Sequence, residues 1–312
     1  MKILFTTLLL LVVTTPIFSQ VDKAIVNDLI VKKADTSGWV INGMSTLNFS
    51  QVGLQNWTGG GNNTVAIQGL FTTTANYLSK NTYWDNSLLL GYGLTKIGTD
   101  PFRKSDDRIM IVSKYGVNAT ENIRYTGLAD FRTQFTIGRN YTAPIDTNIG
   151  DFPKTSNLFA PAFLTTAIGM EYAPTKSLSV LLAPLSGRFT FVNDEDLSNA
   201  GAFGVTPGER MLADIGAFCN ILYTDEVMTN VTVTSRLNLF SRYNSFSTMI
   251  VTWENMITMK VNSFLNVSLA TDVFYDQRIP ITREDGTVGP ATQLRNIFSL
   301  GIGYAFTNVE KK

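Results

Sequence analysis

The sequence predicts an all-β protein, a transmembrane, antiparallel, up-and-down β-barrel of about twelve strands. Three observations predict it. Apolar residues alternate with polar or small ones over many segments, which is the period of a β-strand. Most of these segments are much longer than the roughly 5–6 residues usual for strands of soluble proteins. Tight turns and long loops alternate between the segments, as is typical of outer-membrane barrels.

The C-terminal segment shows the alternation most clearly. Its large apolar positions are Phe298, Leu300, Ile302, Tyr304 and Phe306, and the positions between them are Ser299, Gly301, Gly303 and Ala305. Counting this one, twelve segments are predicted as strands, at about 37–50, 64–79, 82–96, 108–120, 123–138, 161–173, 177–191, 210–224, 227–242, 248–261, 264–277 and 292–307. This count sets the expected size of the barrel.

The connections between these segments are of two kinds. Short joins are expected at Lys80-Asn81, Glu121-Asn122, Pro174 to Lys176, Asp225-Glu226 and Asn262-Ser263, and longer ones at 51–63, 97–107, 139–160, 192–209, 243–247 and 278–291. An even strand number places both termini at the short turns, which are periplasmic in outer-membrane barrels. The soluble alternative is an exported β-sandwich or β-propeller, because alternation alone does not tell which face is outside. Strand length, aromatic content and loop asymmetry favour the barrel.

The N-terminus is interpreted as an export signal. Residues 1–19 combine Lys2, a short apolar run and a small-residue exit at Ser19, which are the parts of a secretory signal peptide. A membrane-anchoring helix is disfavoured because the run is short and Pro16 interrupts it. The expected organisation is a signal peptide (1–19), a short periplasmic segment (20–36), the barrel (37–307) and a periplasmic tail (308–312). Segment 20–36 is either a short amphipathic helix or disordered.

If the apolar face meets lipid, the opposite face lines the lumen and aromatic residues collect near the strand ends. The aromatics near strand ends are Trp39, Phe49, Tyr77, Tyr83, Trp84, Tyr125, Tyr172, Tyr223, Tyr243, Tyr275, Tyr304 and Phe306. The predicted lumen charge network is Asp85, Lys114, Arg124, Asp130, Arg132, Glu171, Arg188, Asp214, Arg236, Arg242, Glu254, Lys260 and Asp272. Because unpaired buried charges are costly, ion pairs across strands are expected. Such pairs would partly occlude a twelve-stranded lumen and argue against a wide porin.

Composition limits the chemistry. The 312 residues include no histidine and one cysteine, which excludes a Ser-His-Asp relay, a His-bearing zinc site and an internal disulfide. Equal numbers of basic and acidic residues, 25 each, give no electrostatic reason to expect a nucleic-acid partner. Glu284-Asp285-Gly286 could supply an acid–base carboxylate pair and Asp194-Glu195-Asp196 could hold Ca²⁺, but an exposed turn and a solvated loop are favoured instead. No catalytic, cofactor or metal residue is predicted.

Two stretches resemble a known family. Residues Leu47 to Gly61, which read LNFSQVGLQNWTGGG, and residues Leu182 to Arg188, which read LAPLSGR, are similar to segments of an uncharacterised outer-membrane β-barrel family from Bacteroidota. The resemblance covers about residues 37–307 and implies a barrel and an outer-membrane location, with no activity. It marks Asn56, Trp57, Gly59 and Gly60 as an extracellular loop motif.

These observations indicate a non-enzymatic protein of the outer membrane of a Gram-negative bacterium. We favour a structural or accessory subunit of a larger outer-membrane assembly, which predicts a charged lumen and surfaces that dock partners. The alternative is a narrow channel for small solutes, which predicts a continuous water path. An enzyme with carboxylates at the barrel mouth is least favoured because histidine is absent. The expected partners are outer-membrane lipid and other outer-membrane or periplasmic subunits.

Overall fold

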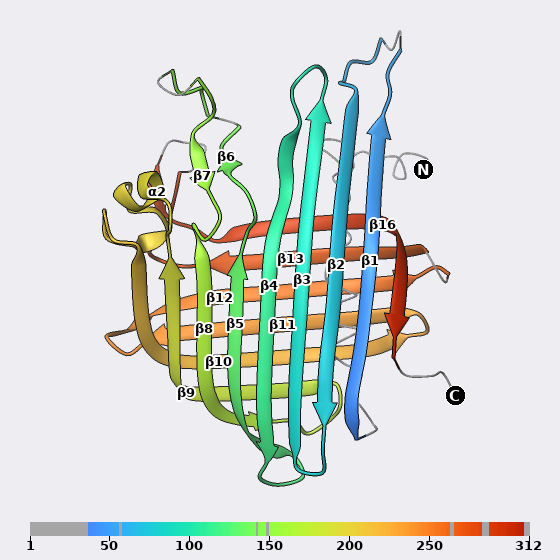
Figure 1. Cartoon of the computed structure of the whole chain (residues 1–312), viewed down its shortest axis with the longest axis vertical. Helices are drawn as coiled ribbons and strands as arrows, with labels where there is room; N and C mark the ends of the chain where they lie inside the picture. Colours follow the sequence, from blue (N-terminus) through green and yellow to red (C-terminus); the bar gives the residue numbers. More distant parts are fainter. Residues whose placement is uncertain are drawn as a thin grey trace, which may run out of the picture.

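A closed antiparallel β-barrel dominates the computed structural model, which describes residues 37–55, 58–141, 143–147, 150–262, 265–282 and 287–308. In this part of the chain, twelve strands close in the order β1-β16-β13-β12-β11-β10-β9-β8-β5-β4-β3-β2. Figure 1 shows the strands of the front wall upright and those of the rear wall running across them, as the steep strand tilt of a barrel requires. The predicted fold class is confirmed.

Each predicted segment corresponds to one barrel strand. The strands are β1 (Gly38–Val52), β2 (Thr64–Leu78), β3 (Thr82–Ile97), β4 (Arg103–Asn118), β5 (Ile123–Thr133), β8 (Ala162–Tyr172), β9 (Leu178–Phe191), β10 (Met211–Met228), β11 (Val231–Arg242), β12 (Ser245–Lys260), β13 (Leu265–Tyr275) and β16 (Gln293–Thr307). The connections carry β6 (Gly138–Arg139), β7 (Lys154–Ser156), α2 (Glu195–Asn199), η1 (Ala202–Gly204), β14 (Pro280–Thr282) and β15 (Val288–Pro290). None of these short elements was predicted from the sequence.

Two predicted connections are misplaced, and a third, expected at 97–107, covers only residues 98–102 because β4 starts at Arg103. The turn expected at Asp225-Glu226 lies further on, because β10 continues to Met228 and Asn230 takes the left-handed backbone (φ 63°) that a tight turn needs. The Glu226 carboxylate accepts a hydrogen bond from the Asn230 N–H at 2.8 Å. The loop expected at 243–247 is a two-residue turn, with β11 ending at Arg242 and β12 starting at Ser245.

The two ends of the barrel differ. The short turns β2–β3, β4–β5, β8–β9 and β10–β11 lie at one end, here the short-turn end, together with the start of β1 and the end of β16. The other end, the long-loop end, carries β6, β7 and α2 (Figure 1). The signal peptide, segment 20–36 and residues 309–312 lie outside the described residues. Asn308, expected in the tail, is tied to β1 because its side chain accepts from the Ile41 N–H at 2.8 Å.

The first and last strands close the barrel through a short seam. Residues Asn42 to Leu47 of β1 pair with Ile302 to Thr307 of β16. On its other side, β1 pairs along its whole length with β2. The seam is therefore the shortest contact between neighbouring barrel strands in the described part of the chain.

Side chains alternate between the two faces of the wall. On β1, Trp39, Ile41 and Leu47 are exposed on the outside, whereas Asn42 and Thr46 are buried inside. The other strands repeat this pattern, and large apolar side chains such as Ile215 (64% exposed) cover the outer wall. An apolar outer belt of this kind suits contact with lipid, as in outer-membrane barrels. No helix in the described part of the chain has the length and hydropathy to cross a membrane.

Aromatic side chains lie on the outside near the short-turn end. The Trp39 ring lies 5.3 Å from that of Tyr77 and 5.7 Å from that of Trp84, between ring centroids. Tyr83, which the sequence placed among the outward aromatics, is only 6% exposed and points into the lumen. Its neighbour Trp84 takes the outward position because successive residues of a strand face opposite sides.

The lumen is more apolar than the sequence predicted. One cluster joins Leu181, Phe218, Phe240 and Ile250 with smaller residues of β8 and β9, and it packs against Leu128 and Phe274. A second cluster joins Met44, Leu70 and Leu89. The expectation that polar residues alone fill the interior is therefore corrected. A closed barrel of this size buries side chains at its centre, and there an apolar side chain requires no hydrogen-bond partner.

Candidate functional site

A buried carboxylate organises the short-turn end of the lumen. Glu171 on β8 is 1% exposed and accepts from the Lys114 ammonium at 2.8 Å and from the Tyr83 hydroxyl at 2.6 Å. The Arg124 guanidinium lies 3.6 Å from the same Glu171 oxygen that accepts from Tyr83, and the Tyr83 hydroxyl also contacts Thr126 at 2.8 Å. Neighbouring strands β3, β4, β5 and β8 supply all these groups, so the cluster lines one wall.

A second ion-pair group crosses the lumen. Arg132 on β5 makes two parallel contacts with Asp130, at 2.9 and 2.8 Å, and a longer one of 3.4 Å with Glu254 on β12. Arg236 reaches the same Glu254 carboxylate at 4.0 Å. Strands β5 and β12 are five steps apart around the barrel, so the Arg132–Glu254 pair joins opposite walls. The lumen is therefore divided at this level.

A third group lies at the long-loop end. Arg278, in the connection after β13, contacts Asp214 of β10 at 2.7 Å and Asp276 at 3.5 Å. Its backbone N–H also donates to Asp276 at 3.0 Å. Sequence reasoning placed Asp214 in the lumen but did not include Asp276 or Arg278. Asp276 lies at the end of the predicted segment 264–277, and Arg278 lies beyond it.

Another buried pair was missed as well. Asp106 and Arg108 on β4 are both buried and lie 2.6 Å apart, and the Gln68 amide donates to Asp106 at 2.9 Å. Gly91 of β3 makes room for them, because a Cβ there would lie 3.0 Å from the Asp106 carboxylate. The prediction that β4 starts at residue 108 placed Asp106 in a loop. The parity of Lys114 could have identified both residues, since they share its face.

The remaining predicted charges occupy different positions. In the backbone register, Asp85 lies opposite Lys114 on the neighbouring strand, and Asp272 lies opposite Glu254. Lys260 is exposed at the short-turn end of β12.

Two lumen arginines have no carboxylate within ion-pair distance among the described residues, although Asp276 and Asp214 attract Arg188 from further away. Arg188 and Arg242 make no hydrogen bond or ion pair with any residue that the structure describes, and the Nε of each is buried. The guanidinium of Arg188 stacks on the Phe163 ring, 5.3 Å from its centroid.

The loop motif is only partly visible. Gly59 and Gly60 are exposed, and Gly60 has φ 76°, a left-handed conformation that glycine adopts without strain. Asn56 and Trp57 lie outside the described residues, as does Glu284-Asp285-Gly286.

A cavity of about 340 Å³, here called the upper cavity, lies in the long-loop half of the lumen. Phenylalanines from four strands line it, together with Ile250, and Phe203 and Ile279 border it from the loops. Its charged residues are Asp130, Arg132 and Arg188. The upper cavity therefore combines mostly apolar walls with three charged groups.

A smaller cavity of about 60 Å³, here called the lower cavity, follows towards the short-turn end. Asp85, Lys114 and Arg236 border it. It shares Asp130, Phe218 and Asn238 with the upper cavity. The two spaces therefore follow one another along the lumen and meet at these shared residues.

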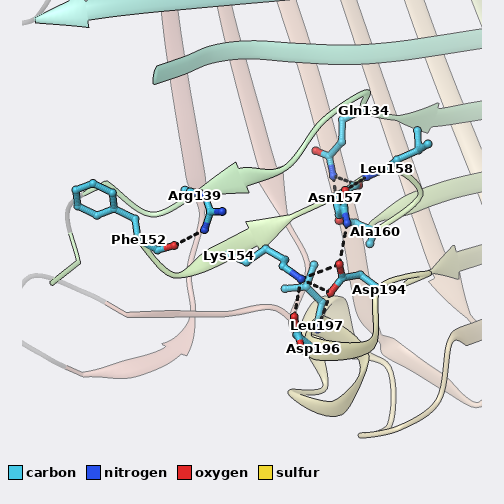
Figure 2. A network of polar contacts seen from close by, with 10 residues as sticks. All are labelled: Gln134, Arg139, Phe152, Lys154, Asn157, Leu158, Ala160, Asp194, Asp196 and Leu197. Atoms are coloured by element: carbon cyan, nitrogen blue, oxygen red, sulfur yellow. Dashed lines mark hydrogen bonds and ion pairs between the residues drawn. The ribbon is translucent and has the colours of Figure 1, made fainter. Parts of the chain in front are cut away.

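Two loops are clasped together at the long-loop end (Figure 2). The Lys154 ammonium on β7 donates to Asp194 at 2.9 Å and to Asp196 at 2.6 Å, and the Asn157 amide donates to Asp194 at 2.8 Å. Asp194 also accepts from the Leu197 N–H at 3.2 Å and so caps α2. Lys154 thus occupies the acidic cluster that the sequence offered to Ca²⁺. The described residues contain no group of His, Cys, Asp and Glu side chains suited to a metal ion.

The clasp changes the titration of both charges. The hydrogen bonds that the Lys154 ammonium donates to Asp196 and Asp194 raise the pKa of Lys154 above its ordinary value. Burial opposes ionisation of Asp194, but donors on Asn157, Lys154 and Leu197 outweigh it and lower the pKa of this carboxyl. Both shifts favour the charged pair.

A known family model matches part of the chain. Residues 49–139 match the model of a family described as a protein of unknown function, DUF3078. This range includes Phe49 to Gly61 of the opening motif. A search of curated proteins found no match.

Solved outer-membrane barrels are similar at low identity. The COG4313 outer membrane channel from Pseudomonas putida F1 shares 10% identity, with a TM-score of 0.40 over 92% of this chain and 100% of that one. The NanC porin shares 11% identity, with a TM-score of 0.37 over 86% of this chain and 100% of that one. The OmpT protein of Vibrio cholerae shares 9% identity, with a TM-score of 0.32 over 88% and 100%. At such values we draw no conclusion about function from them.

Proposed function

We propose that this protein is a narrow channel for small solutes in the outer membrane of a Gram-negative bacterium, with both termini in the periplasm. One observation carries the proposal: two cavities follow one another along the lumen and meet at shared walls. A barrel that serves only as a scaffold gains nothing from such a path. The proposal reverses the preference of the sequence reasoning, which ranked an accessory subunit first.

The lumen chemistry supports a narrow path. Asp130, Phe218 and Asn238 lie between the two cavities, so the solute must be small or displace these side chains. Most lumen charges are paired, as expected where a partly dehydrated charge without a partner is costly. A wide aqueous pore would leave such groups hydrated and would not need close pairs.

Conductance in planar bilayers tests the proposal. We expect the wild-type barrel to give small, ohmic steps, and Phe218→Ala to raise the conductance several-fold because it removes the shared wall of both cavities. Ile221→Ala is the control, since it shortens an apolar side chain of the same strand at a position that alternation places outside. Absence of conductance in the wild type, or equal conductance in both variants, would count against a channel.

An accessory subunit of a larger assembly is the second candidate, and one feature favours it. The outer wall carries a groove of about 580 Å³ whose lining includes Gly127, Ala129, Thr166 and Gly187. Small side chains let another surface approach the strands closely. A wild-type protein that keeps further subunits through mild detergent extraction, and a Gly127→Leu variant that loses them, would support this candidate. A barrel that purifies alone in both cases would oppose it.

A further inference from the structure

We propose that the upper cavity binds a small aromatic monocarboxylate and that Arg188 holds its carboxylate. The inference names the solute class of the proposed channel and rests on that function for its meaning, although binding can be measured separately. It depends on three features: the aromatic walls, an arginine with unused donors, and a mouth partly closed by loops.

The walls of the upper cavity suit an aromatic ring. Phe218 of β10, Phe240 of β11 and Phe274 of β13 line it, and Ile250 lines it from β12, which lies between β11 and β13. Aromatic rings gain from edge and offset contacts with other rings beyond their buried area. The cavity volume of about 340 Å³ is roughly twice the ~150 Å³ of a dry protein cavity that accepts benzene. A single ring with a short side chain therefore fits.

Arg188 lines this cavity and is not held by a close ion pair, although Asp276 and Asp214 attract its guanidinium from further away. The other charged groups nearby are engaged, because Arg132 binds Asp130 at 2.8 Å and Arg278 binds Asp214 at 2.7 Å. Arg188 lies opposite Asp214 in the β9–β10 register, yet Arg278 takes that carboxylate. The buried Nε of Arg188 has no acceptor among the described residues, and its guanidinium stacks on Phe163.

A carboxylate would satisfy Arg188. A guanidinium offers paired donors in a fork that matches two carboxylate oxygens, and buried donors without acceptors are unfavourable. The aromatic walls would then surround the remainder of the solute. Asp130 also lines the cavity and disfavours a second negative charge. These features select a monocarboxylate over a dianion and over an amine, which Arg188 would repel.

The loops give the site an outer boundary. Phe203 of η1 borders the cavity and has a left-handed backbone (φ 59°), which is uncommon for a bulky residue and aims the segment over the mouth. The adjacent Gly204 approaches Arg278 so closely that a Cβ there would lie 3.3 Å from the Arg278 Cβ. The β9–β10 connection and the connection after β13 therefore meet above the cavity, on the side from which the solute enters.

Calorimetric titration of the detergent-solubilised barrel with 3-phenylpropionate tests the inference. We expect saturable binding by the wild type, and binding weakened about tenfold or more for the neutral isostere 3-phenylpropionamide, since the charged hydrogen bonds are lost. This ligand comparison needs no variant and therefore holds whatever a substitution does to folding. 2-Phenylethylamine should not bind measurably.

A pair of variants then assigns the anchor. Arg188→Gln should weaken 3-phenylpropionate binding about tenfold or more. Arg242→Gln should change it less than about twofold, because it removes the same charge from a lumen side chain that does not line the cavity. Equal loss in both variants, or equal affinity for acid and amide, would overturn the inference. Tight binding without conductance would refute the channel alone, and conductance without acid-selective binding would refute the inference alone.

Discussion

Replacing Glu171 by Gln should destabilise the barrel more than any other neutral substitution of a carboxylate described above. The carboxylate is 1% exposed and serves three groups at once: Lys114 at 2.8 Å, Tyr83 at 2.6 Å and Arg124 at 3.6 Å. A glutamine keeps the shape but removes the charge. It also turns a donating NH₂ towards one of these donors.

The magnitude follows from the burial of the partners. Removing one member of a buried ion pair typically costs about 3–5 kcal/mol, because the other charge stays dehydrated. Lys114 and Arg124 keep 18% and 15% of their side chains accessible, so each regains some hydration. We therefore expect the free energy of unfolding to fall by about 3 kcal/mol, the lower end of that range.

Urea titration of the barrel folded into liposomes provides the measurement. Glu121→Gln is the matched control, since Glu121 is exposed at a short turn and should stay within about 0.5 kcal/mol of the wild type. Adding Lys114→Gln to Glu171→Gln should recover at least about 1 kcal/mol, because it removes one stranded cation. A Glu171→Gln barrel as stable as the control would refute the idea that this cluster stabilises the short-turn end.

Three further predictions concern the loops and the wall. Lys154→Met should raise hydrogen–deuterium exchange in residues 192–210, because Asp194 and Asp196 lose their shared donor; unchanged exchange would show that the clasp does not order this loop. The difference in hydrogen-exchange protection of residues 192–210 between the wild type and Lys154→Met should be constant from about pH 5 to 9. It should begin to fall only below about pH 4 and vanish at still lower pH, since the lowered pKa of Asp194 makes its contribution complete above the ordinary carboxyl value and lost as pH falls through the folded one. It should also begin to fall only above about pH 10.5 and vanish at still higher pH, since the raised pKa of Lys154 makes its contribution complete below the ordinary amine value and lost as pH rises through the folded one. A difference that varies near neutral pH would contradict both. Gly169→Ala should reduce the heat-modifiable folded fraction on gels, because its Cβ would lie 2.0 Å from the Leu182 carbonyl oxygen. Gly127→Ala is the control, since its Cβ would meet nothing within 4 Å and the variant should fold normally. Equal folding of the two variants would refute the idea that the close approach of β8 and β9 requires a glycine at position 169.

The regular part of this fold could be predicted because membrane strands obey a local rule. A period of two places Leu300, Ile302 and Tyr304 on the outer face without knowledge of any other strand. The prediction that aromatic residues near strand ends face outwards fails where it conflicts with this rule. Tyr83 is aromatic and near a strand end, yet parity directs it inwards to Glu171.

The site was harder to predict because it depends on contacts between distant segments. Arg188 was placed in the lumen correctly by parity, but its lack of a carboxylate depends on Arg278, which lies in a loop and takes Asp214. The clasp between Lys154 and Asp194 joins two loops that carry no periodic signal. Such pairings between loops follow from tertiary geometry and leave no local trace in the sequence.

The short seam between β1 and β16 has a consequence for biogenesis. It joins the first and last barrel strands that the structure describes, so the ring cannot close before β16 is in place. Until then, two strand edges expose unpaired peptide groups that lipid cannot satisfy. A truncation before residue 302 would therefore leave a ring that never seals.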